Sequence, residues 1–193
     1  RKESSAASDV YKRQWLIRKG QFAKAEPYLR RAVKTLTEKN PNPYDGEPLY
    51  NLGLSLKYQG KTDEAYDCFY KACWNAAWQD AGYYSLAQLS ASKGNWEEAL
   101  YEIDKSLLRN WHNLRGRHLK AVVLRHLGRV DEALALIRES LAIDRFNFGC
   151  SFEEYLLTGE KAVLDDLLVR MRSEGHNYCL LYTSPSPRDV EES

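Results

Sequence analysis

Cysteine and histidine are the side chains of this sequence whose chemistry could support a metal site or a nucleophile. The cysteines are Cys68, Cys73, Cys150 and Cys179. They form no Cys-x-x-Cys pair and no cysteine–histidine cluster of the kind that binds zinc. Cys68 and Cys73 are five residues apart on one predicted helix and point to different faces. We therefore expect reduced, packing cysteines, as in a cytoplasmic protein, and we expect no metal ion and no cofactor.

The histidines give no stronger indication of catalysis. They are His112, His118, His126 and His176. His118 and His126 are eight residues apart and could share a helix face, but a metal pair prefers i,i+4 spacing and a third ligand. The sequence contains no nucleotide-binding loop, no nucleophile elbow and no His-Glu-x-x-His motif. It predicts a protein that is not an enzyme, with histidines that face a groove or solvent.

Composition narrows the class of partner. The formal net charge is +1, whereas a general nucleic-acid surface needs a clear basic excess. No run of 18 apolar residues occurs, so the sequence predicts no membrane-spanning helix. Hydrophobic residues make up 44% of the chain, which is enough for a continuous core. We expect a cytoplasmic protein that binds neither nucleic acid nor a membrane.

One eight-residue sequence motif occurs three times and indicates how the chain is built. It occupies residues 58–65, 92–99 and 126–133, and its glycines, Gly60, Gly94 and Gly128, are 34 residues apart each time. In each copy the glycine suits the left-handed residue that ends one helix. A pair of acidic residues then suits the first turn of the next helix. A period of this length predicts stacked helix–turn–helix repeats.

The repeat resembles the tetratricopeptide repeat. The residues that carry the resemblance are Leu52, Gly53, Gly60, Ala65, Phe69 and Ala72; Tyr83, Leu86, Ala87, Gly94, Trp96 and Ala99; and Ala121, Leu124, Gly128 and Ala133. Ser106 and Ser140 depart from the pattern, because the family usually has a second packing alanine there. The closing proline is also absent, with Ala77, Trp111 and Arg145 in its place. The resemblance implies an all-α, right-handed α-solenoid that acts as a non-catalytic protein-interaction scaffold.

The repeat pattern also divides the chain. The predicted solenoid covers residues 15–178, with units at about 15–37, 47–79, 80–113 and 114–147 and a degenerate unit at 150–173 that could act as a cap. Residues 1–14 and 179–193 look like translated library-adapter sequence, and we expect the second of these tails to be disordered. The segment between the tails would then be a fragment of a longer protein.

A second, narrower resemblance keeps an alternative function open. The unusual phrases at 69–78, 109–114 and 155–159 look like the repeat region of large bacterial proteins that also carry a carbohydrate-enzyme-like β-sandwich domain of unassigned function. The alternative to a free scaffold is therefore an accessory repeat arm that packs on a β-sandwich domain of the same parent chain. Such an arm is expected to leave an apolar face exposed when it is isolated.

Tetratricopeptide arrays bind extended peptides in a concave groove lined by the first helix of each unit. The positions that the resemblance assigns to this groove are Tyr50, Asn51, Lys57, Tyr58, Tyr84, Gln88, Arg115, His118 and Arg125. Because Lys57, Arg115 and Arg125 are basic, we expect the ligand to be an acidic or carboxylate-bearing segment of a protein. The alternative is that these three charges form a solvated face without a partner.

Four tryptophans could be read in two ways. They are Trp74, Trp78, Trp96 and Trp111, and they recur near the junctions of the repeats. They could stack on sugar rings, but tryptophans at such junctions more often wedge between helices in the core. We expect the core placement.

Overall fold

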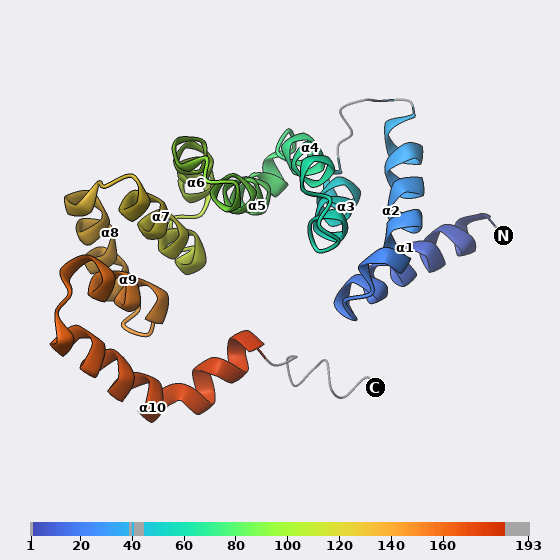
Figure 1. Ribbon diagram of the computed structural model, residues 1–193. Coiled ribbons are helices and arrows are strands. Elements are labelled where there is room, and N and C mark those ends of the chain that lie inside the picture. The colour runs from blue at the N-terminus through green and yellow to red at the C-terminus, as the bar shows by residue number, and fades with distance from the viewer. Residues whose placement is uncertain (1, 39, 41–44, 184–193) are drawn as a thin grey trace. The chain divides into compact units, whose positions relative to one another are not determined.

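The computed structural model describes residues 2–38, 40 and 45–183, with side chains described for 9–38, 40 and 45–173. These residues form ten α-helices and one short 3-10 helix and contain no strand (Figure 1). The elements are α1 Lys2–Arg18, α2 Phe22–Thr37, α3 Glu47–Lys57, α4 Thr62–Ala72, η1 Ala76–Trp78, α5 Gln79–Ser92, α6 Trp96–Arg109, α7 Leu114–His126, α8 Val130–Ile143, α9 Phe148–Thr158 and α10 Lys161–Thr183. The all-α repeat fold predicted from the sequence is confirmed.

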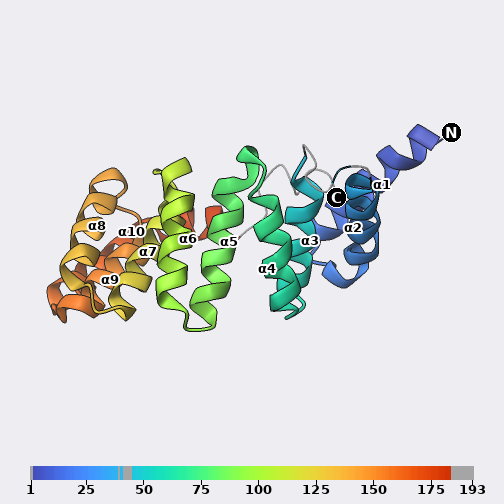
Figure 2. The same ribbon diagram turned by 90° about the horizontal axis from the view of Figure 1, so that it is seen from above.

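The chain divides into two compact units, Arg1–Trp111 and His112–Ser193. In the first unit each helix from α1 to α6 packs on the next one, and Figure 2 shows α3 and α4 side by side. In the second unit α7 packs on both α8 and α9, and α9 packs on α10. Each unit is thus a row of antiparallel helix pairs.

The glycine of each repeat ends the first helix of its pair. Gly60, Gly94 and Gly128 have φ values of 78°, 78° and 72°, a left-handed conformation that costs glycine little because it lacks a Cβ. The backbone N–H of the residue after the glycine donates a hydrogen bond to a carbonyl in the last turn of the helix. For example, Lys61 N donates to Leu56 O at 3.0 Å. The sequence predicted this conformation, and it explains why the glycine recurs at a fixed spacing.

The core consists of the inward positions of the second helices and the residues that face them. Ala65, Ala99 and Ala133 are fully buried, as their small size and spacing predicted. Phe69 is also fully buried, and its ring approaches Gly53 so closely that a Cβ added there would lie 2.7 Å from a ring carbon. The residue types that repeat are therefore those that let neighbouring helices approach each other.

At both ends, the helices extend beyond the residues that the sequence assigned to the solenoid. Helix α1 includes residues 2–14, which the sequence suggested were a foreign tail, and its Leu16 is buried in the core of the first unit. Helix α10 continues beyond residue 173, where the predicted degenerate unit ends, and through residues 179–183, past the predicted end of the solenoid at residue 178. Residues 184–193, the rest of the predicted disordered tail, lie outside the described residues. The adapter origin of both tails stays a prediction.

The expected core placement of the tryptophans is wrong for two of them. Trp74 is 50% exposed and Trp111 is 43% exposed, whereas Trp78 and Trp96 are partly buried. Trp74 lies two residues beyond the end of α4, and its ring meets the exposed ring of Tyr70 edge-on at 6.4 Å between centroids. Beyond the end of the helix, its ring packs beside another surface ring instead of entering the core.

The carboxyl group of Glu102 is buried between neighbouring repeats. The Tyr66 hydroxyl on α4 lies 2.7 Å from Glu102 Oε1 and 3.1 Å from Glu98 Oε1, both on α6. The Tyr66 hydroxyl is the donor, and it has one proton to share between these two carboxyl groups. Burial raises the pKa of Glu102 above its ordinary value of 4.5, and the pKa of Tyr66 is also raised by burial.

We predict that this carboxyl makes stability depend on pH. Because the folded-state pKa of Glu102 is raised, its contribution to the free energy of unfolding is fully present below pH 4.5 and is lost as pH rises through the folded pKa. A Glu102→Gln variant keeps the Tyr66 contact without the ionisation, so it should gain stability over the parent as pH rises. Urea unfolding from pH 4 to 8 measures the difference. Parallel profiles for parent and variant would contradict the assignment, and Glu98→Gln, at the exposed acid, is the control.

Candidate functional site

Three of the predicted groove residues form a hydrogen-bonded chain between α3 and α5. Lys57, the last residue of α3, donates from Nζ to Oε1 of Gln88 on α5. Gln88 donates in turn from Nε2 to the hydroxyl of Tyr84, one helical turn earlier, at 3.0 Å. Lys57 and Gln88 are 31 residues apart in the sequence, and their hydrogen bond links the first helices of two successive repeats. We refer to Lys57, Tyr84 and Gln88 as the Lys57 site.

The Lys57 ammonium is held by neutral groups. Besides the Gln88 amide oxygen, it lies 6.0 Å from the centroid of the Tyr58 ring. The side chain is half-buried, and this burial lowers the pKa of Lys57. A cation removed from water without an anionic partner is electrostatically under-compensated, so an added carboxylate would interact favourably with it.

Aromatic side chains flank the Lys57 site. The ring of Tyr58 is 63% exposed and stacks on Phe22 from α2, with 4.6 Å between ring centroids. Tyr50 is more buried than Tyr58, and its ring lies 4.9 Å from that of Trp78 between centroids. Burial raises the pKa of Tyr50. Tyr58 therefore presents a supported ring face beside the cation, while Tyr50 serves mainly in packing.

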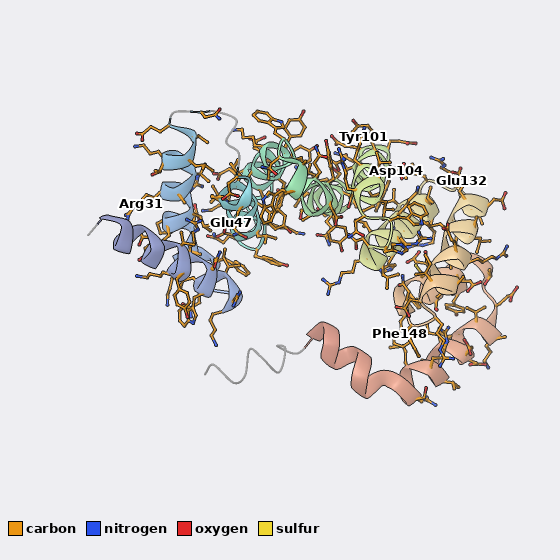
Figure 3. The ribbon with its side chains drawn as sticks, turned by 180° about the vertical axis from the view of Figure 1, so that it is seen from behind. Arg31, Glu47, Tyr101, Asp104, Glu132 and Phe148 are labelled. Atoms are coloured by element: carbon orange, nitrogen blue, oxygen red, sulfur yellow. The ribbon has the colours of Figure 1, made fainter. Side chains whose placement is uncertain are left out.

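Asn51 belongs to a separate polar group at the start of α3. Its side-chain amide donates to Glu47, whose carboxylate also pairs with Arg13 of α1 at 2.7 Å (Figure 3 labels Glu47). The Glu47 and Arg13 side chains are largely buried, with 17% and 10% of their surfaces exposed. The charges here are matched within the first unit, so Asn51 is less free to bind a ligand than the Lys57 site.

The predicted basic residues of the second unit lie in different surroundings. The Arg125 guanidinium pairs with Glu153 on α9, at 2.6 Å, and the Glu153 side chain is only 5% exposed. Arg115 is exposed near the start of α7. The charge of Arg125 is thus largely offset within the protein, and reversing that charge would disturb packing as well as any binding.

His118 is also used internally. It is half-buried on α7 and faces Gly149 of α9, where an added Cβ would lie 2.5 Å from His118 Nδ1. Burial lowers the pKa of His118, while the nearby Glu153 carboxylate acts in the opposite direction. The ring therefore fills the contact between two first helices, which favours a packing role over ligand binding.

Two partners of predicted groove residues, one in each unit, were not found by sequence reasoning. Phe22 supports Tyr58 from 36 residues away, and Glu153 pairs with Arg125 from 28 residues away. Neither separation equals the repeat period, so comparison of equivalent positions does not reveal these pairs. Glu153 could have been noticed in the sequence because it is an acidic residue at a core-facing position of a short, largely apolar helix.

The described side chains show no further chemistry of the kind that catalysis needs. They include no group of three histidine, cysteine or acidic residues that could hold a metal ion. Burial raises the pKa of Cys73 to about 12 and those of Cys68 and Cys150 to about 11, so these thiols stay protonated at neutral pH. No described helix is both long enough and apolar enough to cross a membrane.

Comparison with protein families identifies the repeats. Models of the tetratricopeptide repeat match residues 46–73 and 117–143. This chain contains tetratricopeptide repeats. The first match covers α3 and α4, and the second covers most of α7 and α8. Each tetratricopeptide match thus falls on one complete or nearly complete helix pair and includes its left-handed glycine.

Solved structures show the same fold. MamA from Desulfovibrio magneticus RS-1 superposes with a TM-score of 0.72 at 18% identity, over 88% of this chain and 96% of that one. A tetratricopeptide repeat protein from Parabacteroides merdae gives a TM-score of 0.69 at 20% identity, over 94% of this chain and 71% of that one. At such identities the likeness establishes a helical repeat solenoid. Tetratricopeptide repeats generally mediate binding of proteins or peptides and are typically non-catalytic scaffolds.

Proposed function

We propose that this protein is a non-catalytic, cytoplasmic scaffold that binds an extended acidic segment of a partner protein, with the Lys57 site as the main anchor. The observation that carries the proposal is the half-buried Lys57 ammonium, which contacts an amide oxygen and an aromatic ring. Nucleic acids and membranes are not part of the proposal, because the net charge is only +1.

A carboxylate at the Lys57 site would have several partners. It could accept hydrogen bonds from the Lys57 ammonium and, after rotation of the Gln88 amide, from Gln88 Nε2. The exposed ring of Tyr58 offers an apolar surface to the residue next to that carboxylate. These side chains already stand on packed helices, so little conformational entropy would be lost on binding.

The remaining predicted groove residues take subordinate places in the proposal. Tyr84 orients Gln88, and Tyr50 and Asn51 shape the adjoining part of the first unit. In the second unit, Arg115 would add positive charge to the surface of that unit, whereas His118 and Arg125 would serve mainly through their packing contacts with α9. Charge and preorganisation together would select the partner.

Substitution of Lys57 tests this proposal. Lys57→Met keeps the apolar stem and removes the charge, so we expect the affinity for a fluorescein-labelled glutamate-rich peptide to fall about tenfold, equivalent to about 1.4 kcal/mol. The melting temperature should not fall, because the variant no longer buries an unpaired cation. Fluorescence anisotropy at two salt concentrations measures the binding, and the affinity of the parent should decrease with salt.

Two controls make the test specific. Lys71→Met removes an equivalent charge from an exposed position on α4, outside the proposed site, and should leave the affinity unchanged. A glutamine-for-glutamate version of the peptide should bind the parent more weakly. Equal binding by the parent and Lys57→Met would show that the Lys57 site is not the anchor.

One observation favours the alternative, an accessory arm that packs on another domain of its parent chain. Exposed apolar side chains gather on the second helices of the first unit, with Tyr70 and Trp74 at the end of α4 and Tyr101 and Leu108 on α6 (Figure 3 labels Tyr101). An arm of this kind would bind an apolar-surface dye in isolation, and Trp74→Ser would reduce the signal. The same substitution should not affect binding at the Lys57 site.

A further inference from the structure

The last helix pair of the second unit exposes apolar side chains. Phe152 and Leu156 on α9 are 45% and 43% exposed, and Leu168 and Met171 on α10 are 40% and 39% exposed. We call these four residues the α9–α10 face. Phe152 and Leu156 are one helical turn apart, as are Leu168 and Met171, and apolar side chains grouped in this way are costly to leave in water.

The positions of the α9–α10 face are covered in the earlier repeats. Asn113 and Asn147 cap α7 and α9 with the same side-chain hydrogen bond, and they are 34 residues apart. This spacing makes Phe152 equivalent to His118, one repeat earlier, and to Tyr50, three repeats earlier. His118 lies against Gly149 on the first helix of the following pair. Tyr50 lies against Trp78, the residue that leads into the following first helix.

The second helix of the pair shows the same difference. Counting nine residues from the left-handed glycine, Leu168 is equivalent to Phe69, Ile103 and Ile137, because Gly159 also has a positive φ of 69°. Those three equivalents are fully buried, whereas Leu168 is not. Phe69 shares its cluster with Leu86 and Leu89, which belong to the first helix of the next pair.

We propose that the α9–α10 face binds the first helix of a further tetratricopeptide-type helix pair. The contacts that such a helix makes are visible within each unit, where Phe69 shares its cluster with Leu86 and Leu89 of α5, and His118 lies against Gly149 of α9. By analogy with Gly149 opposite His118, the bound helix carries a small residue opposite Phe152. A unit that capped the array would carry polar residues on this face instead.

The proposal can be tested by supplying the missing helix. A copy of residues 110–143, which contains α7 and α8 and carries Arg115→Gly at the position equivalent to Gly149, is inserted after Ser173, where α10 has reached about the length of α8. In the extended chain, Phe152→Glu should lower the melting temperature by at least about 4 °C, because it places a charge in a packed junction. In the parent chain the same substitution should change it by less than about 1 °C. Val169→Glu, at an exposed position of α10, is the matched control in both chains.

The measurement separates the outcomes. An equal, small effect of Phe152→Glu in both chains would overturn the proposal, as would a large effect in the parent, since the face would then already be covered. Light scattering provides the second test, which does not depend on folding of the extended chain. If the parent self-associates and Phe152→Glu makes it monomeric, the occupant is a second copy of this chain and the proposed helix pair is wrong. A monomeric parent whose dye binding falls in the Phe152→Glu variant supports an open docking face.

Discussion

Replacing Phe69 with alanine is expected to lower the free energy of unfolding of the first unit by about 3–5 kcal/mol. The side chain is fully buried and contacts both helices of its own pair and the first helix of the next one. Its ring lies 5.4 Å from that of Tyr50 and fills the space left by the missing Cβ of Gly53. The surrounding helices are held by several other contacts, so they cannot collapse fully into the cavity.

The same substitution at another phenylalanine provides the control. Phe152→Ala removes a ring that is 45% exposed, so it should cost less than about 1 kcal/mol. Urea unfolding followed by helical circular dichroism compares both variants with the parent. In a repeat array the loss at Phe69 acts on an interface between units, so unfolding should also become less cooperative. A cost below that of Phe152→Ala would mean that Phe69 is not a core residue.

Much of the fold could be predicted because the same residue types recur at equivalent positions in several repeats. Gly60, Gly94 and Gly128 each occupy the left-handed turn, and Ala65 and its equivalents each lie at a close helix contact. These requirements depend on backbone conformation and on side-chain size. Both are local properties, so a spacing of 34 residues carries them from one unit to the next.

The site could be predicted only in part, because its properties depend on contacts between units. The sequence identified both Lys57 and Arg125 as basic groove positions, but the structure places Gln88 beside the first and Glu153 beside the second. A neutral neighbour leaves the charge of Lys57 available to a ligand, whereas an acidic one offsets the charge of Arg125. The difference comes from individual side chains on the next first helix, which the repeat pattern does not constrain.

Serine at a position where the family usually has alanine has a structural explanation. Ser106 donates to Asp80 Oδ1 at 2.9 Å, and Ser140 accepts a hydrogen bond from Arg117 Nε at 2.7 Å. Both serines are fully buried, so the hydroxyl fits where a methyl group would and also provides a polar partner. The departure from the family pattern is therefore linked to polar side chains on the first helix of the same pair, Asp80 and Arg117.

Arg117 is the second residue for which we expect a large effect. Its side chain is fully buried, with Nε bonded to Ser140 and Nη2 3.2 Å from a carboxylate oxygen of Glu139. Arg117→Ala should lower the free energy of unfolding of the second unit by about 2–5 kcal/mol, mainly through the cavity left by the long side chain. The hydroxyl of Ser140 still donates to Leu136 O, and Glu139 is half-exposed and can be hydrated again.

Arg117→Met separates packing from charge. Methionine fills most of the same volume without a buried cation, and the Glu139 carboxylate that loses its partner is 51% exposed and can be hydrated. We therefore expect Arg117→Met to be at least about 2 kcal/mol more stable than Arg117→Ala, and close to the parent. Arg138→Ala, at an exposed position of α8, controls for the loss of a surface arginine. If Met and Ala cost the same, the guanidinium itself stabilises the second unit, and Arg117 is an electrostatic anchor between α7 and α8 and not mainly a space-filling one.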